Sequence, residues 1–478
     1  MSEELGITTK KEEDPAEWYR EVVIKSGLAD YSSVGGCIVF KPRSYSIWEK
    51  VRKEIDRRFH DIGIENAYFP LFIPEKLLEK EAEHFEGFTP EVAWVTRAGS
   101  SDLDERLAIR PTSEAIMYDS YKDWVRSWRD LPLKINQWNN VVRWEFKHAT
   151  PFLRTREFLW QEGHCAYATD DGVLEDKERV LDAYQEVCED YLAIPCVRGR
   201  KTEKEKFSGA VDTYSLEHLL PDGKAIQGPT YHNDGTNFAK AFDITYTDED
   251  GEEKYVRQST FGFSTRQIGT MIMMHSDDRG LVVPPKVAPT RSVIVPIYHS
   301  KDERKAVMEV AEKVHGSLER CKMDDRENKT PGWKFNEWEV KGVPIRIEIG
   351  PSEAEEDQVT IVRRDTGEKK MVSVENVEET VEEELNNMQK SLFKRATELL
   401  EEGTQEVRDY DDLVSIVEEN GGFVKAPWCG KKICEEIVKD DTSAKITNIP
   451  FMYDEPDGEK CIRCGDKAKH WVNFAKSY

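Results

Sequence analysis

Aromatic and charged side chains alternate between residues 158 and 164, where Phe158, Trp160, Glu162 and His164 occupy every second position. If this segment is a β-strand, the four side chains share one face, because side chains on a strand alternate between its two faces. A structural strand would carry aliphatic side chains there, whereas aromatic walls with a few charged groups are typical of a ligand pocket. The pattern therefore predicts one wall of a binding site. The alternative is an amphipathic hairpin whose polar side faces water.

The arginines near this wall can meet an anionic ligand. Arg143 and Glu145 lie two positions apart on the preceding predicted strand, so they are expected to face the same way. Arg154 lies in the turn between the two strands, and Arg266 follows Gly262 at a strand-to-helix junction. Glycine lets a ligand approach the backbone closely, and a guanidinium supplies a permanent charge. The segment 259–278 is by itself compatible with a nucleotide site without establishing one.

Four of the nine cysteines form two close pairs, Cys429 with Cys434 and Cys461 with Cys464. Two such pairs suit a tetrahedral zinc ion in a closed structural site. The alternative is a degenerate site or unpaired thiols. The other five cysteines are scattered without pattern, and we expect them to be reduced thiols.

Hydrophobic spacing predicts the elements that position these side chains. An amphipathic helix is expected over 43–62, because Ile47, Trp48, Val51, Ile55, Phe59 and Ile62 recur at helical spacing. The other expected elements near the site are an edge or interface strand over 66–74, which contains Pro70, a helix from Pro111 to Trp124, strands over 139–147 and 156–168, and a helix over 171–192.

A domain boundary is predicted near residues 284–290, where three prolines interrupt the pattern. After it, strands over 293–298, 344–349, 358–364 and 370–374 alternate with helices over 301–320 and beyond 376, which favours a compact α/β module. The tail carries the paired cysteines. We therefore expect three domains, over 1–285, 286–398 and 399–478.

The composition limits the location and the partners of the chain. No apolar run approaches the roughly 20 residues that a membrane span needs, and the first residues lack the apolar stretch of a signal peptide. We therefore expect a cytoplasmic protein with no membrane partner. The net charge of −25 argues against a general nucleic-acid binder. Local basic segments, 198–206 and Arg363–Arg364, leave either RNA contact or solvated surface open.

Taken together, these segments resemble the class II aminoacyl-tRNA synthetases, and among them the prolyl-tRNA synthetases of the archaeal/eukaryotic type. The helix 43–62 with Phe69-Pro70, the hairpin with Arg143 and Glu145, and Gly262 with Arg266 resemble the three class motifs. The proline-specific resemblance lies in RPTSE (110–114), FLRTREFLWQEGH (152–164), RKTEKEKFSG (200–209) and AIQG (225–228). The resemblance implies an α+β fold, in which a catalytic antiparallel sheet flanked by helices is followed by an α/β anticodon-binding domain and a small zinc domain.

The resemblance also implies roles for individual residues. Arg143 and Arg266 would be catalytic, with Arg143 bridging the carboxylate of proline and the α-phosphate of ATP. The residues implied to bind proline are Thr112, Glu114, Arg143, Trp160, Glu162, His164, Phe207 and His232. Those implied to bind ATP are Arg143, Glu145, Arg154, Thr155, Phe158, Gln227, Thr230, Ser264 and Arg266. From the residues alone, Thr112 and Glu114 could equally be a helix cap, and Phe207, His164 and His232 could be structural.

The implied ligands are ATP, proline, Mg²⁺, a structural Zn²⁺ on the four paired cysteines, and tRNA(Pro). Arg346, Glu348 and Arg363 are candidates for reading the anticodon; the alternative is a strand with solvated charges. The resemblance further implies a homodimer. Bacterial-type relatives carry an editing insertion between the second and third motifs, and the short interval here leaves no room for one. Two other functions were weighed: a non-catalytic synthetase relative that binds tRNA, and a zinc-stabilised scaffold.

Overall fold

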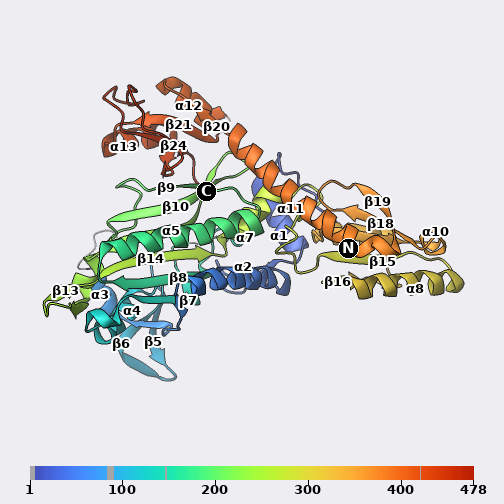
Figure 1. Ribbon diagram of the computed structural model, residues 1–478, viewed down its shortest axis with the longest axis horizontal. Coiled ribbons are helices and arrows are strands. Elements are labelled where there is room, and N and C mark those ends of the chain that lie inside the picture. The colour runs from blue at the N-terminus through green and yellow to red at the C-terminus, as the bar shows by residue number, and fades with distance from the viewer. Residues whose placement is uncertain (1–5, 83–90, 146–147, 420) are drawn as a thin grey trace.

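The computed structural model describes residues 6–82, 91–145, 148–419 and 421–478 (Figure 1). Its centre is an eight-stranded sheet in the order β23-β9-β10-β11-β14-β8-β7-β3. Neighbouring strands are antiparallel except β3 and β7. The strands are β3 (Glu65–Asn66), β7 (Leu133–Val142), β8 (Glu157–Tyr167), β9 (Val197–Arg200), β10 (Asp212–Leu219), β11 (Ala225–Gly235), β14 (Arg257–Ser264) and β23 (Ile449–Pro450). The predicted class II antiparallel sheet is confirmed.

Helices cover the two faces of this sheet unequally. One face packs against α1 (Pro15–Lys25), α2 (Pro42–Asp61), α5 (Asp170–Glu186) and α7 (Arg266–His275), which share its largest apolar core. Helix α2 forms as predicted, because its apolar residues from Ile47 to Phe59 make one buried stripe. The other face carries α3 (Glu75–Ala82), α4 (Glu114–Trp124) and α6 (Asn237–Phe242) at one end. Between these helices and the sheet, this second face stays open to form a cavity.

Two predicted strands differ from the structure. The segment 66–74 does not form one strand: β3 pairs with β7, whereas β4 (Phe72–Pro74) joins a separate sheet with β5 (Trp94–Ala98) and β6 (Ser101–Ile109). Pro70 lies between them and cannot donate a ladder hydrogen bond. The strand predicted over 139–147 is β7, which begins six residues earlier and ends at Val142. Residues 146 and 147 lie outside the described residues.

The α/β module after residue 290 contains a five-stranded sheet in the order β16-β15-β17-β18-β19. Its predicted strands and its two longest helices are present. The elements are β15 (Ser292–Pro296), α8 (Lys301–Ser317), β16 (Cys321–Met323), α9 (Pro331–Val340), β17 (Ile345–Ile349), α10 (Pro351–Glu355), β18 (Gln358–Arg363), β19 (Lys369–Ser373) and α11 (Val377–Glu402). The elements β16, α9 and α10, which are short, are not among those predicted from the sequence. Helix α11 runs without interruption through residues 398 and 399.

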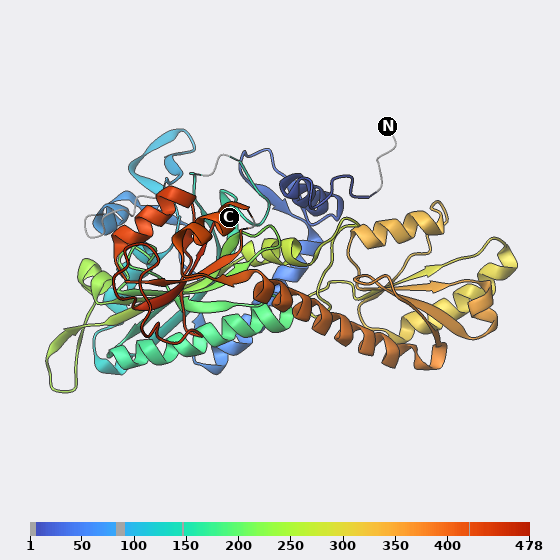
Figure 2. The same ribbon diagram turned by 90° about the horizontal axis from the view of Figure 1, so that it is seen from above.

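Helix α11 links this module to the C-terminal module, as both views show (Figures 1 and 2). The C-terminal sheet has the order β20-β21-β24-β22 and packs with α12 (Tyr410–Glu419) and α13 (Lys432–Thr442). Its strands are β20 (Thr404–Glu406), β21 (Phe423–Trp428), β22 (Lys445–Ile446) and β24 (His470–Ala475). From the same module, β23 leaves to pair with β9, so the C-terminal module supplies one edge of the catalytic sheet.

Short hairpins complete the described structure: β1 (Ala29–Tyr31) with β2 (Ile38–Phe40), and β12 (Thr245–Thr247) with β13 (Glu253–Tyr255). None of the helices in the described ranges combines the length and the apolar character that crossing a bilayer requires.

Candidate active site

The open face of the central sheet encloses a cavity of about 710 Å³. Strands β8, β10, β11 and β14 supply most of its walls, and the start of α4 closes one end. All of the predicted proline and ATP residues line this cavity except two. Those that line it are Thr112, Glu114, Arg143, Glu145, Phe158, Trp160, Glu162, His164, Phe207, Gln227, Thr230, His232, Ser264 and Arg266. The structure thus brings together residues that are up to 154 positions apart.

Glu162 is the centre of a buried polar network. Its Oε1 accepts hydrogen bonds from Ser113 Oγ (2.5 Å), Gln137 Nε2 (3.0 Å) and Asn139 Nδ2, and its Oε2 contacts His164 Nε2 (3.0 Å). Burial would raise the pKa of Glu162, but the hydrogen bonds from His164, Ser113 and Asn139 lower it. A buried carboxylate with this many donors is held ionised in one orientation. The carboxylate of Glu162 is therefore held in one orientation at the cavity wall.

The two cavity histidines differ in charge. Burial would lower the pKa of His164, but the hydrogen bond to Glu162 and the charge of Glu114 raise it above 6.5, so His164 forms an ion pair with Glu162. Burial, reinforced by the positive charges of His164 and Lys201, lowers the pKa of His232 to about 3. His232 is therefore neutral, and its ring nitrogens contact Thr213 Oγ1 (2.9 Å) and Thr230 Oγ1 (3.1 Å).

We expect the pKa values of these two histidines to differ in opposite directions from that of a free imidazole. The stabilisation from His164 is fully present below pH 6.5 and is lost as the pH rises through its raised native pKa. His232 acts in the opposite sense: below pH 6.5 its unfolded form takes up a proton that its native form does not bind, so acid destabilises the fold. NMR of protein with ¹⁵N-labelled histidine would follow both rings, with His164→Gln and His232→Gln identifying the signals. A neutral His164 ring at pH 6 would contradict the ion pair.

Two arginines bring positive charge to the other end of the cavity. Arg143 stacks near Phe158 and Trp160, at 5.5 Å and 5.7 Å from the ring centres, and Arg266 donates to the carbonyl oxygens of Leu153 and Gln227. Burial, with the charges of Arg143 and Arg154, lowers the pKa of Arg266 to about 10. These cations therefore repel one another, and a polyanionic ligand would relieve that repulsion.

Four predicted ATP residues are placed differently from the expectation. Arg143 and Glu145 do not share a strand face, because β7 ends at Val142 and the chain turns at Trp144 and Glu145. Arg154 does not line the cavity; its Nη2 contacts the main-chain oxygen of Tyr478 (3.4 Å), although its charge still acts on Arg266. Thr155 is buried, and its hydroxyl donates to the Glu157 carbonyl oxygen (2.6 Å).

The residues that orient Glu162 are not among the site residues predicted from the sequence. Gln137 lies opposite Glu162 in the register of β7 and β8, so Gln137 and Asn139 lie on the same face of the sheet as Glu162. The signal was the alternation of polar residues at 137 and 139. It was overlooked because the strand was expected to begin at 139. Ser113, the third donor, lies inside the RPTSE segment already singled out.

The four paired cysteines converge in the C-terminal module. Their sulfur atoms all lie within 4.8 Å of one another, and Cys429 Sγ is 3.7 Å from the sulfurs of both Cys434 and Cys464. Zinc–sulfur bonds of about 2.3 Å in a tetrahedron place the sulfurs roughly 3.7–3.8 Å apart. The donor set and its spacing therefore fit a closed zinc site.

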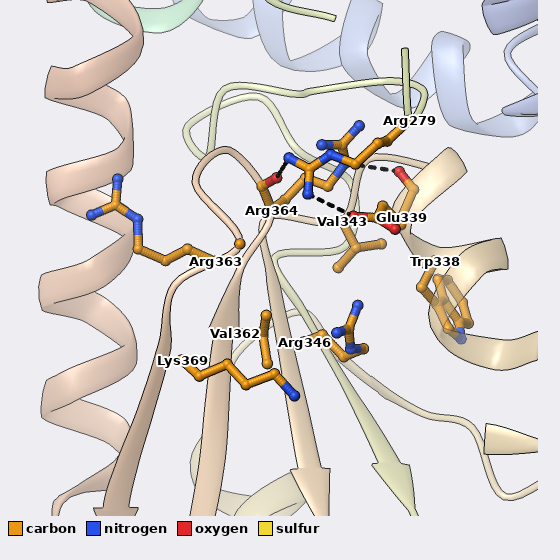
Figure 3. A pocket seen from close by; sticks show the side chains of 10 residues that line it. Arg279, Trp338, Glu339, Val343, Arg346, Val362, Arg363, Arg364 and Lys369 are labelled. Atoms are coloured by element: carbon orange, nitrogen blue, oxygen red, sulfur yellow. Dashed lines mark hydrogen bonds and ion pairs between the residues drawn. The ribbon is translucent and has the colours of Figure 1, made fainter. Parts of the chain in front are cut away.

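Two of the three predicted anticodon-reading residues, Arg346 and Arg363, line a smaller cavity of about 140 Å³ in the α/β module, whereas Glu348 does not (Figure 3). Arg346 points toward Trp338, whereas Arg363 points toward α11. The register explains this difference: Arg363 pairs with Ile345, so it lies on the opposite face from Arg346. Arg346 binds Glu348 (2.8 Å) and packs on Phe335, while Arg363 is held by carboxylates of Asp365 and Glu384.

The basic segment 198–206 is largely neutralised within the chain. Arg198 pairs with Glu178 and Asp182, and Lys201 is buried against Glu217 (2.6 Å). Lys201 also donates to the Thr447 carbonyl oxygen (2.6 Å), which ties the C-terminal module to the catalytic sheet. Most of the charge of this segment is therefore used in contacts within the protein, and Lys201 connects two modules. Little of that charge is left for a nucleic acid.

Comparisons with known proteins cover the whole chain. Residues 88–275 match the class II tRNA synthetase core domain of the G, H, P, S and T enzymes, residues 291–384 match the anticodon binding domain, and residues 410–478 match the C-terminal domain of prolyl-tRNA synthetase. A proline–tRNA ligase of Natranaerobius thermophilus is 52% identical over 98% of both chains. One of Halorubrum lacusprofundi is 48% identical over 100% of this chain and 99% of its own. The crystal structure of Cryptosporidium parvum prolyl-tRNA synthetase with halofuginone and AMPPNP superposes with a TM-score of 0.94 at 43% identity, and covers 99% of this chain and 97% of its own.

Proposed function

Because the chain belongs to the prolyl-tRNA synthetase family and so ligates proline to tRNA, we propose how its own residues perform the two steps. The observation that supports the assignment is the single cavity that joins an arginine-lined end to an end lined by Glu114, Glu162 and the two histidines. The first end suits a triphosphate, and the second suits a small amino acid with a cationic amine. ATP–pyrophosphate exchange measured with each amino acid in turn tests the assignment: proline alone should give fast exchange.

In the first step, a carboxylate oxygen of proline attacks the α-phosphorus of ATP, and pyrophosphate leaves. We assign to Arg143 the bridging of the carboxylate and the α-phosphate, since it lies between the aromatic wall and Glu114. Arg266 binds the outer phosphates, with Arg154 beside it, and Phe158 stacks on the adenine. Mg²⁺ bound together with the triphosphate would supply further charge neutralisation. Catalysis of this kind rests on positioning and electrostatics.

The proline end of the cavity matches a cationic ring. The carboxylate of Glu114 is buried beside the Thr112 hydroxyl, where it can accept the two N–H donors of the secondary amine. Trp160, Phe207 and the neutral His232 supply the apolar and aromatic walls; the ring centres of Phe207 and His232 are 4.8 Å apart. The ion pair of Glu162 and His164 is satisfied within the protein, so it shapes the wall without demanding a ligand partner.

In the second step, the 3′-hydroxyl of the terminal adenosine of tRNA(Pro) attacks the prolyl carbonyl carbon and AMP leaves. We propose Arg346 and Glu348 as readers of anticodon bases, because they lie on one strand face beside a cavity. Arg363 is a weaker candidate, since two carboxylates hold it. We propose that this transfer takes place in the cytoplasm.

Two assembly features complete the proposal. We assign Zn²⁺ to Cys429, Cys434, Cys461 and Cys464 as a structural ion, because four ligands leave no open position. We propose that the protein is a homodimer and assign its interface to the face around β1 and β2. The large apolar side chains exposed there are Tyr31, Val34, Val39 and Tyr45. Sedimentation of the purified protein at several concentrations tests the dimer.

We also propose that the chain does not proofread its own product. Between β8 and β14 it forms helix α5, strands β9 to β11 of the catalytic sheet, helix α6 and the β12–β13 hairpin, which leaves no separate editing module in this interval. A missing methylene changes binding in an apolar pocket by only about 1–3 kcal/mol, or roughly 10–200-fold. Alanine, which is smaller than proline, should therefore be activated at a detectable rate. Purified Ala-tRNA(Pro) incubated with the enzyme should persist, and its rapid deacylation would reveal an editing site.

A further inference from the structure

Two of the cysteines that are scattered in the sequence meet a histidine behind the ATP end of the cavity. Cys188 lies in a π-helical turn (Val187–Tyr191) that directly follows α5. Cys196 precedes β9, and His218 is on β10. One potential ligand atom from each lies within 4.8 Å of the other two. Cys188 and His218 are fully buried, whereas Cys196 is partly exposed. The cluster lies more than 200 residues before the first cysteine of the C-terminal module.

His218 is arranged as a metal-binding histidine commonly is. Its Nδ1 is 3.0 Å from the carbonyl oxygen of Pro195, so Nδ1 carries the proton and Nε2 keeps its lone pair. That Nε2 atom is buried and makes no hydrogen bond of good geometry among the described residues, and the side chain that interacts with the ring is the thiol of Cys188, a second candidate ligand. Metal-binding histidines usually donate their second ring nitrogen to a carbonyl or a carboxylate, which fixes the ring. A buried nitrogen without a well-formed hydrogen bond is costly, and a metal ion would remove that cost.

We propose that Cys188, Cys196 and His218 bind a second zinc ion. Two thiolates and one imidazole are ligands that zinc prefers, and their two negative charges balance Zn²⁺ in this buried place. On binding, each thiol loses its proton to solvent and forms a bond to the metal; no electron is transferred. Tetrahedral geometry needs ligand atoms roughly 3.4–3.8 Å apart, so atoms that now lie within 4.8 Å of one another would close by at most about 1.4 Å. Gln267 Oε1, 3.9 Å from Cys188 Sγ, or a water takes the fourth position.

The position of this site gives it a role in the cavity. A Cβ atom on Gly228 would come within 2.5 Å of His218 Nε2 and 3.0 Å of Gln267 Nε2, so the cluster lies directly behind the cavity wall at Gly228. Gln267 follows Arg266, and the carbonyl of Gln227 accepts a hydrogen bond from Arg266. The ion would therefore fix the wall that positions Arg266, acting as a support and not as a reactant. Loss of the ion should raise the KM for ATP more than it changes the KM for proline.

Metal analysis of the purified, full-length protein tests the proposal. The wild type should hold about two zinc ions per chain, one in each cluster. Cys188→Ala and Cys196→Ala should each lose one ion and keep the other, while Cys461→Ser should lose the ion of the C-terminal module. Cys165→Ala and Cys321→Ala are matched controls, buried and partly exposed respectively, and should keep both ions.

Two results would overturn the proposal. One is a wild-type protein with a single zinc ion that Cys188→Ala and Cys196→Ala leave in place. The other is a disulfide between Cys188 and Cys196 in the wild type, which mass spectrometry of the non-reduced protein would detect. If both alanine variants misfold, Co²⁺ substitution of the wild type decides: two spectroscopically distinct thiolate sites support the proposal, and a single four-thiolate site contradicts it. None of these readouts depends on activity, so they remain informative whatever the amino-acid specificity proves to be.

Discussion

Arg266→Ala and Arg143→Ala should each lower the rate of ATP–pyrophosphate exchange by about 10²–10³-fold, the effect of removing a donor aimed at transition-state charge. Both guanidiniums line the main cavity, and burial leaves their charge poorly screened. The substitutions relieve the mutual repulsion of the buried cations, so we expect the fold to survive them. Exchange assays at saturating proline, with circular dichroism to check folding, measure both expectations.

Arg304 is the control for these variants. It lies in α8 of the α/β module, outside the main cavity, and forms a surface pair with Glu327. Arg304→Ala should leave exchange within a factor of about two, because exposed pairs contribute little. Near-normal exchange in Arg266→Ala would contradict the assignment of the triphosphate to that end of the cavity. Loss of exchange in all three variants would instead indicate general damage to the protein.

Cys461→Ser should remove the zinc ion of the C-terminal module and lower the thermal stability of that module strongly. Structural zinc in small domains contributes apparent free energies of about 10–16 kcal/mol at pH 7, because the unfolded chain lacks a preformed site. The cost here should be several kcal/mol, since an apolar core and the contacts of Lys201 also hold the module. Metal analysis and differential scanning calorimetry measure the two losses.

The matched control is Cys321→Ser, a partly exposed thiol of the α/β module that lies outside both cysteine clusters. It should keep the zinc of the C-terminal module. If Cys461→Ser retains that ion in full, the ligand set is wrong. If it loses the ion without any change in unfolding, the site is not structural.

The sequence predicted the aromatic wall better than the segments around it. Residues 158–164 lie inside a long central strand, so strict alternation fixed which side chains face the cavity. Helix α2 was equally clear, because its apolar stripe from Ile47 to Phe59 continues for more than three turns. Arg143 and Glu145 were misjudged because strand ends depend on the next turn, and alternation carries no information about where pairing stops.

Contacts between distant segments were beyond the reach of local patterns. Nothing in the spacing of Cys188, Cys196 and His218 indicates that a helix end, a loop and a strand converge. The same holds for Gln137, whose role follows from its register with Glu162. The cluster of Cys429, Cys434, Cys461 and Cys464 could be predicted because the two cysteines of each pair are close in sequence. The orientation of Arg154 toward Tyr478 depends on how two modules dock, which no motif encodes.

The pairing of β23 with β9 has a consequence for how this protein is made. The catalytic sheet has an edge partner that is encoded about 250 residues after β9. At ribosomal rates of about 5–20 residues per second, β9 emerges on the order of tens of seconds before that partner. During this interval the nascent catalytic domain presents an open strand edge, which is the surface through which sheets associate wrongly. The C-terminal module, made after the catalytic sheet, therefore also serves to close the edge of that sheet.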